Sequence, residues 1–271
     1  MILVNEQWQG GGEPRARDGV LELEALYLKD RRDYVTVPAD PDPRLEMRHR
    51  ILGYDVILRQ TAEAARLLEK ERPDTLFTVG GSCDADVASL SYLSQKYGGD
   101  LTMFWFDAHG DLNAPEESIT HLYYGMPGRT MLEPQLGFVD LVPVPMKPEN
   151  WVQIGGRDFD PPETAYIKKR AITHVSMPQT ASDEALEAVL RARAGCNAYI
   201  HFDLDVLGPA EFVATPLPSA NGLAIRRALE LFRLIESHTR LVGMGLFEYT
   251  PVNQRLPWVQ EVLSFADRLK G

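Results

Sequence analysis

The sequence predicts an α/β fold with a mainly parallel sheet flanked by helices on both faces. Apolar runs of strand length alternate with longer segments of helical spacing through the 271 residues, which is the pattern of a parallel sheet joined by crossover helices. Several of the apolar runs end abruptly in acidic residues, at the edge where open parallel sheets carry their sites. No internal repeat, low-complexity tract or linker divides the chain, so we expect a single domain over residues 1–271.

Short apolar runs bounded by turn residues predict the strands. In chain order these runs are Ile2–Val4, Tyr34–Val37, Thr75–Val79, Leu101–Phe106, Trp151–Ile154, Ile172–Val175, Ala198–Asp205 and the glycine-broken Leu241–Phe247. The run Leu101–Phe106 contains almost no polar residue, which favours a central strand buried on both faces.

Longer segments with helical spacing predict the helices. They are Asp18–Leu28, Ile51–Glu71, a segment after Asp84 that reaches Tyr97, a segment opening at Pro161, Ser182–Arg193, a segment that follows Asn221-Gly222 and reaches about Glu236, and Trp258–Leu269. The clearest is Ile51–Glu71, whose expected buried stripe is Ile51, Val56, Ile57, Ala64, Leu67 and Leu68. Asp84 is placed to cap its helix, and prolines suit the first turn at Pro161.

The remaining segments read as connections. Gln9–Pro14 predicts a flexible turn, and Pro38, Pro41 and Pro43 predict a rigid loop. Leu112–Tyr124 is long and polar, as a loop lining a site often is.

Composition excludes several classes of function. Hydrophobic residues make up 44% of the chain and charged residues 25%, as in ordinary soluble globular proteins. The formal net charge of -11 argues against nucleic-acid binding but suits a cationic small molecule. The two cysteines, Cys83 and Cys196, imply no disulfide framework, so we expect a cytoplasmic protein. We see no signal peptide and no apolar run of membrane-spanning length, so no membrane contact is expected.

Acidic residues crowd the ends of two predicted strands. Asp107, His109 and Asp111 follow the first within five residues, and Asp203 and Asp205 share a face of the second. Helix capping explains an isolated aspartate but not such a cluster, since neighbouring desolvated carboxylates need a counter-ion. Oxygen-rich ligation with one imidazole favours ions such as Mn²⁺ over a structural Zn²⁺. Four aspartates and a histidine exceed what one ion takes, so two ions that activate one water are expected.

Three stretches carry a resemblance to a known family. Gly80–Cys83, Asp107–Asp111 and Asp203–Pro209 resemble the signature motifs of the ureohydrolase (arginase/agmatinase) family, in the family's order. The similarity runs from about Ile51 to beyond Glu248. It implies an arginase/deacetylase-like parallel sheet, two Mn²⁺ ions, and hydrolysis of a small guanidino substrate to urea or a similar product. Family members are often trimers or hexamers, so the resemblance also implies a homo-oligomer.

The resemblance assigns roles by motif. It implies the metal ligands Cys83, Asp107, His109, Asp111, Asp203 and Asp205. Asp107 and Asp203 would bridge the two ions, and a metal-bridging hydroxide would attack the guanidinium carbon. Asp111 would then pass a proton to the leaving nitrogen, and Glu248 would pair with the planar cation. Positions similar to those that hold the amino-acid part of the substrate in arginases are Asn113, Asp158, Asp160 and Thr215.

The chain departs from the family at two site positions. Cys83 stands where most members have a metal-binding histidine, so another divalent ion could occupy that site, or the cysteine could lie beside a half-filled one. Cysteine at this position resembles a minor branch that includes the hydroxyarginine hydrolase of D-cycloserine biosynthesis. Tyr124 stands where arginases commonly have a proton-shuttling histidine, and His121 is a candidate for that role. His201 shares a face with Asp203 and is interpreted as a packed or ligand-supporting histidine.

Several functions remain open at this point. The first is a binuclear amidinohydrolase that converts N-hydroxy-L-arginine or L-arginine to L-ornithine plus hydroxyurea or urea. The second is another ureohydrolase, such as an agmatinase, a guanidino-acid hydrolase or a formiminoglutamase. The third is a non-catalytic family member. A Rossmann-type nucleotide binder is disfavoured, because Gly80-Gly81 is not part of a Gly-X-Gly-X-X-Gly turn.

Overall fold

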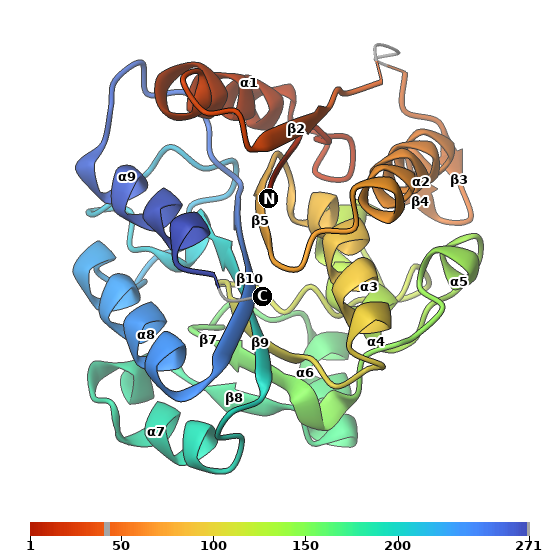
Figure 1. Cartoon of the computed structure of the whole chain (residues 1–271). Helices are drawn as coiled ribbons and strands as arrows, with labels where there is room; N and C mark the ends of the chain where they lie inside the picture. Colours follow the sequence, from red (N-terminus) through yellow and green to blue (C-terminus); the bar gives the residue numbers. More distant parts are fainter. Residues whose placement is uncertain (41–43, 270–271) are drawn as a thin grey trace.

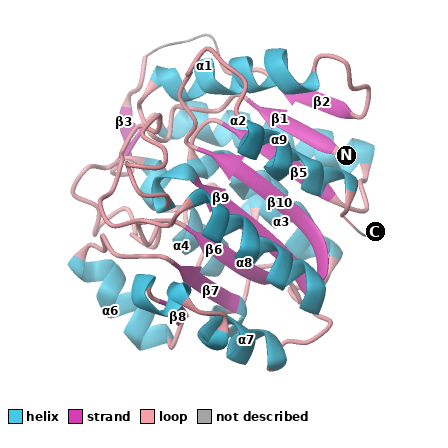
Figure 2. Ribbon diagram, turned by 90° about the vertical axis from the view of Figure 1, so that its left-hand side faces the viewer, coloured by secondary structure: helices cyan, strands magenta, loops and turns pink. Residues whose placement is uncertain are grey.

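Eight parallel strands form one sheet in the order β2-β1-β5-β10-β9-β6-β7-β8. The computed structural model describes residues 1–40 and 44–269, so the predicted loop positions Pro41 and Pro43 lie outside the described residues. The strands are β1 (Ile2–Asn5), β2 (Tyr34–Val37), β5 (Leu76–Gly80), β6 (Thr102–Phe106), β7 (Trp151–Ile154), β8 (Thr173–Val175), β9 (Asn197–Asp203) and β10 (Arg240–Phe247). Figure 2 shows them side by side, with many of the connecting loops gathered along one edge. The predicted fold class is confirmed.

Helices cover both faces of this sheet (Figure 1). One apolar core lies between the sheet and α1 (Pro14–Leu23), α7 (Glu184–Arg191), α8 (Ile225–His238) and α9 (Pro257–Leu263). The other lies between the sheet and α2 (Tyr54–Glu71), α3 (Val87–Lys96), α4 (Pro127–Leu132), α5 (Phe138–Leu141) and α6 (Pro161–Arg170). Alternate residues of β6 serve the two cores, since Phe104 and Phe106 face the first while Met103 and Trp105 face the second. None of the helices in the described ranges has the length and apolar composition that crossing a bilayer requires.

The starts of α1 and α2 differ from the predicted ones for local reasons. The helix α2 starts at Tyr54 because Ile51 and Leu52 form β4, which pairs antiparallel with β3 (Met47–Arg48). Gly53 separates hairpin from helix with a φ of 75°, a conformation that glycine adopts without strain. The helix α1 begins at Pro14 rather than Asp18, since the Glu13 side chain caps its first turn, and a π-helix then continues through Glu24–Leu28.

Other predicted boundaries shift for local reasons. Asp84 does not cap a helix; it lies inside a 3₁₀ turn, Cys83–Asp86, and accepts hydrogen bonds from Gln7 and Ser82. The predicted helices ending at Arg193 and Leu269 are shorter, as α7 and α9, and 3₁₀ turns flank them at Met177–Ala181 and Ser264–Asp267. The short helices α4 and α5 were not predicted, because neither is long enough to show a helical period.

The register of the central strands places the acidic strand ends together. Phe106 of β6 lies opposite Phe202 of β9, and Phe247 of β10 lies opposite Asp203. On the other side of β10, Leu246 pairs with Val79 of β5. The carboxyl ends of β5, β10, β9 and β6 are therefore consecutive along one edge of the sheet.

Candidate functional site

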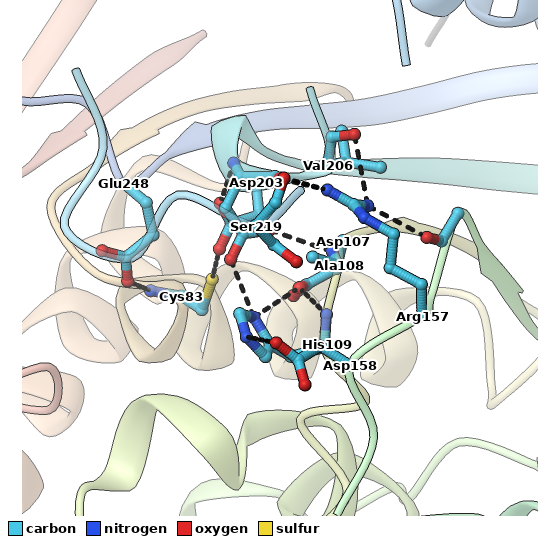
Figure 3. Close-up of polar contacts among 12 residues, drawn as sticks. Cys83, Asp107, Ala108, His109, Arg157, Asp158, Asp203, Val206, Ser219 and Glu248 are labelled. Atoms are coloured by element: carbon cyan, nitrogen blue, oxygen red, sulfur yellow. Dashed lines mark hydrogen bonds and ion pairs between the residues drawn. The ribbon is translucent and has the colours of Figure 1, made fainter. Parts of the chain in front are cut away.

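Four adjacent strands deliver buried side chains to this edge. Cys83 follows β5, Asp107 follows β6, Asp203 ends β9 and Glu248 follows β10, and each is at most 4% exposed. The Cys83 backbone N–H donates to Glu248 Oε1 at 3.0 Å, and its Sγ lies 2.9 Å from Asp203 Oδ2. Figure 3 shows Cys83 between Glu248 and Asp203. The edge predicted from the sequence is thus a compact, desolvated cluster.

His109 adds an imidazole to the same cluster. Its Nδ1 lies 2.8 Å from Asp205 Oδ2 and 3.5 Å from Asp107 Oδ1. Backbone donors fix both carboxylates, because the His109 N–H donates to Asp107 at 2.6 Å and the Ala108 N–H donates to Asp205 at 2.9 Å. Two aspartates and one ring nitrogen therefore converge on one point.

The cluster concentrates negative charge where water is excluded. Burial raises the pKa of Asp203 well above its ordinary value, and the nearby charges of Asp205 and Asp107 raise it further. Burial is also the main cause of the raised pKa of Asp111 and of Glu248. Asp111 Oδ2 is buried and has no hydrogen-bond partner among the described residues. Such an arrangement calls for bound cations.

Backbone strain at two of these residues indicates a built site. Asp111 has a φ of 54° and Glu248 a φ of 59°, and both lie in the left-handed region that side chains other than glycine rarely adopt. Hydrogen bonds hold them there, since the Glu248 N–H donates to the Gly81 carbonyl at 2.9 Å and the Asp111 carbonyl accepts from the Arg129 N–H at 3.1 Å. Strain of this kind is retained mainly at functional sites.

Among the described residues, three overlapping groups of side chains could each hold a metal ion, because in each group the three ligand atoms lie within 4.8 Å of one another. They are Cys83/Asp107/His201, Cys83/Asp203/Glu248 and Asp107/His109/Asp205. Two of the sets share Asp107 and two share Cys83. The donors are carboxylate, imidazole and thiol groups, which together fit divalent ions, and the orphaned oxygen of Asp111 adds a further donor.

A cavity of about 220 Å³ opens beside the cluster. Its lining is mostly polar and comprises His109, Asp111, Asn113, Ser118, Thr120, Tyr124, Gly125, Asp158, Asp160, Glu163 and Leu217. It contains acidic acceptors at Asp158 and Asp160 and amide or hydroxyl donors at Asn113, Ser118 and Thr120. A ligand with both a cationic and an anionic group would find partners for each.

Asn113 and Asp160 are joined to each other at the cavity wall. Asn113 Nδ2 donates to Asp160 Oδ2 at 2.9 Å, while Asn113 Oδ1 is buried without a partner among the described residues. Asp160 also caps α6 in a capping box with Glu163. Glu163 in turn accepts hydrogen bonds from the N–H groups of Leu112 and Asp160, and burial raises its pKa to about 7.

Of the predicted site residues outside the cluster, some line the cavity and others do not. Tyr124 lines the cavity, and burial raises the pKa of its hydroxyl, so it stays protonated near neutrality. His121 does not line this cavity, and its carbonyl accepts a hydrogen bond from Leu52 of β4. Thr215 is buried, and its hydroxyl has no hydrogen-bond partner within residues 1–40 and 44–269; its neighbour Ala214 accepts a hydrogen bond from Thr250 just past β10.

Three residues that position the cluster were missed by the sequence reasoning. Trp105 Nε1 donates to Asp107 Oδ2 at 2.9 Å, and Gln153 Nε2 donates to the His109 carbonyl at 2.5 Å. Arg157 uses all five of its N–H groups on backbone carbonyls, those of Gly155, Asp205, Val206, Ser219 and Ala220. Figure 3 shows its guanidinium beside Val206 and Ser219. The only signal in the sequence was an arginine in an otherwise acidic loop after β7.

Comparison with known proteins gives a consistent result. The model of the arginase family matches residues 9–255. An arginase of Staphylococcus aureus (strain MRSA252) is 28% identical over 236 residues, 84% of this chain and 78% of that protein. The crystal structure of Entamoeba histolytica arginase in complex with L-ornithine superposes with a TM-score of 0.86 at 19% identity, over 98% of this chain and 95% of that one. A putative agmatinase from Clostridium difficile gives a TM-score of 0.69 at 18% identity, over 98% and 93% of the two chains.

Proposed function

Because this chain belongs to the arginase family and is a hydrolase of guanidino C–N bonds, we propose that its substrate is an arginine-type amino acid. The candidates are N-hydroxy-L-arginine and L-arginine, with L-ornithine plus hydroxyurea or urea as products. The observation that carries the proposal is the pairing of two features in one cavity. A buried acidic cluster suits a cationic guanidinium, and a rim with both donors and acceptors suits the α-amino and α-carboxylate groups.

The side chains divide the work of binding and proton transfer. We propose that two divalent ions bind here, Mn²⁺ in both positions or another ion beside Cys83. When bound, they would supply an activated water. Glu248 pairs with the planar guanidinium, since its Oε1 is already oriented by the Cys83 N–H. Asp111 carries a proton to the leaving nitrogen through its unpartnered Oδ2. Tyr124 excludes water from the cavity and donates a hydrogen bond, because its raised pKa makes it a poor proton shuttle.

The α-amino and α-carboxylate groups of the substrate are held by residues that line the cavity. Asn113 offers donors to the α-carboxylate, with Ser118 and Thr120 alongside, and Asp158 and Asp160 accept from the α-ammonium. One observation favours a second candidate, another ureohydrolase whose substrate lacks the α-carboxylate. Asn113 Nδ2 already donates to Asp160, and a simple guanidino amine would leave that hydrogen bond intact.

The proposal extends to assembly and location. We propose a homo-oligomer in the cytoplasm, acting on a small guanidino compound and on neither nucleic acid nor membranes. The net charge of -11 supports the absence of nucleic-acid binding, and the free thiols of Cys83 and Cys196 support a reducing compartment, while the homo-oligomer rests on analogy with the family.

A direct test measures release of urea or hydroxyurea by the Mn²⁺-reconstituted protein, with L-arginine, N-hydroxy-L-arginine and agmatine supplied in parallel, and identifies the co-product as ornithine or, from agmatine, putrescine. We expect hydrolysis of an amino-acid substrate and at least a tenfold rise in KM for it in Asn113→Ala (about 1.4 kcal/mol). Asn150→Ala, which lies outside the cavity, is the matched control and should leave KM unchanged. Hydrolysis of agmatine alone would instead support the second candidate. Two bound metals with no hydrolysis of any of the three would reject the arginine-type amino acid as the substrate.

A further inference from the structure

His201 forms a buried hydrogen-bonded chain that the proposed reaction does not use. Its ring is stacked between those of Trp105 and Phe247. The ring centroids are 3.4 Å apart with an interplanar angle of 2° for Trp105, and 4.4 Å apart with an interplanar angle of 10° for Phe247. The side chain is 0% exposed. With both ring faces covered, only its two nitrogens are available for polar contacts.

Each nitrogen of His201 points at one specific group. Nδ1 lies 2.9 Å from Asp86 Oδ2, and Nε2 lies 3.4 Å from Cys83 Sγ. Tyr199 donates to the other oxygen of Asp86 at 2.5 Å, so this carboxylate is held from two sides. Because the carboxylate accepts, Nδ1 is the donor, and the lone pair of Nε2 is directed at the thiol. Histidine ligands of metals are commonly oriented in this way: one ring nitrogen donates to a carboxylate, and the lone pair of the other nitrogen points toward the metal.

The spacing of the two donor atoms also fits one ion. Bonds of about 2.3 Å to sulfur and about 2.0–2.1 Å to nitrogen, at a tetrahedral angle, place the two donors about 3.6 Å apart. The observed separation of 3.4 Å between His201 Nε2 and Cys83 Sγ is close to that value. An Asp107 oxygen lies within 4.8 Å of both, and Trp105, which covers the His201 ring, also holds Asp107.

We propose that Cys83 and His201 together ligate one of the two ions, as a sulfur–nitrogen pair completed by Asp107. The inference deepens the proposed function, since it assumes the two-ion centre. It goes beyond the six ligands implied by the resemblance, because His201 comes from the interior of β9 and is oriented by Asp86. A thiolate and an imidazole favour Zn²⁺ or Co²⁺ over Mn²⁺, whereas the neighbouring set of His109, Asp107 and Asp205 has oxygen donors and one imidazole. The chain therefore has one softer and one harder metal position.

The test measures ligation rather than hydrolysis. Protein stripped of metal is loaded with one equivalent of Zn²⁺ for X-ray absorption, and with Co²⁺ for the thiolate-to-cobalt absorption band. We expect a sulfur scatterer at about 2.3 Å with imidazole nitrogen at about 2.0–2.1 Å in the wild type. Asp86→Asn should weaken Zn²⁺ binding at this position about 10–100-fold while leaving Mn²⁺ binding at the other position unchanged. His201→Gln should weaken it more and shift the cobalt band.

The chain offers matched controls for both ligands. His174 and Cys196 lie outside the cluster, so His174→Gln and Cys196→Ser should retain the wild-type Zn²⁺ affinity and cobalt spectrum. A first equivalent of Zn²⁺ without sulfur in the wild type would overturn the inference even if His201→Gln failed to fold. Wild-type Zn²⁺ affinity in both Asp86→Asn and His201→Gln would do the same. Loss of ornithine release with the zinc–sulfur signal intact would fault the proposed substrate and leave this inference standing.

Discussion

Replacing Arg157 should cost both stability and metal affinity. Its five N–H groups donate to five backbone carbonyls, and three of these bonds are short, at 2.6 Å to Ala220, 2.8 Å to Asp205 and 2.9 Å to Ser219. A hydrogen bond from a charged donor contributes about 1.5 kcal/mol or more, so losing these three in Arg157→Met should cost about 4–5 kcal/mol. Arg157→Lys keeps the charge but has three donors on one atom, so it should cost about 2 kcal/mol.

The assay combines urea unfolding with calorimetric metal titration. Because Arg157 holds the carbonyl of the metal-ligand candidate Asp205, its loss should weaken binding of the ion at His109 about 10–100-fold. Arg191→Met is the matched control, since that arginine is exposed and pairs with Glu187 along one helix, and it should change stability by under about 0.5 kcal/mol. An Arg157→Met protein within about 1 kcal/mol of wild type, with unchanged metal affinity, would refute this reasoning.

Three further outcomes follow from the same contacts. Burial raises the pKa of Glu163 from its ordinary 4.5 to about 7, so the folded state holds this proton more tightly than the unfolded state. The resulting stabilisation is fully present below pH 4.5 and is lost as the pH rises through 7, so the free energy of unfolding of the wild type minus that of Glu163→Gln should fall by about 3 kcal/mol over that window. A difference that does not change with pH would contradict the raised pKa. Gly81→Ala would place a Cβ 2.3 Å from the Gln7 carbonyl oxygen and should cost about 1–3 kcal/mol, whereas the control Gly125→Ala meets no atom within 4 Å and should be near neutral in thermal unfolding. Chelation should lower stability by about 2.7 kcal/mol for each ion previously held at 100 times its Kd, and a melting temperature independent of metal concentration would exclude binding to the folded state.

Most strands of the large sheet were predictable because they are buried apolar runs bounded by turn or polar residues, whereas the two-residue strands β3 and β4 were not predicted. The run from Leu101 to Phe106 needed no tertiary information, and its acidic end located the site. Helix starts were less predictable, since Ile51 continues the helical period of α2 but is used in a hairpin with β3. Periodicity cannot tell a residue that pairs as a strand from one that opens a helix, because either choice buries it.

The long-range partners of the site could not be read from the chain. Asp86 and His201 are 115 positions apart, and their contact depends on how the turn after β5 lies against β9. Arg157 likewise finds carbonyls some 60 positions away, at Ser219 and Ala220. Backbone acceptors leave no trace in residue identity, so such a brace has no sequence signature beyond the arginine itself.

The strand order has a consequence for synthesis of the protein. β5 and β6 are consecutive strands of the sheet in the sequence, yet β10 and β9 lie between them. Until β10 is in place, the other strands form two fragments, β2-β1-β5 and β9-β6-β7-β8. The second fragment carries the whole Asp107/His109/Asp205 set, whereas a set that includes Cys83 is completed only when β10 joins the two fragments. The high proportion of distant pairings favours slow folding. A nascent chain stalled before β9 would leave the edges of β5 and β6 without their neighbours, and unpaired strand edges of this kind promote aggregation.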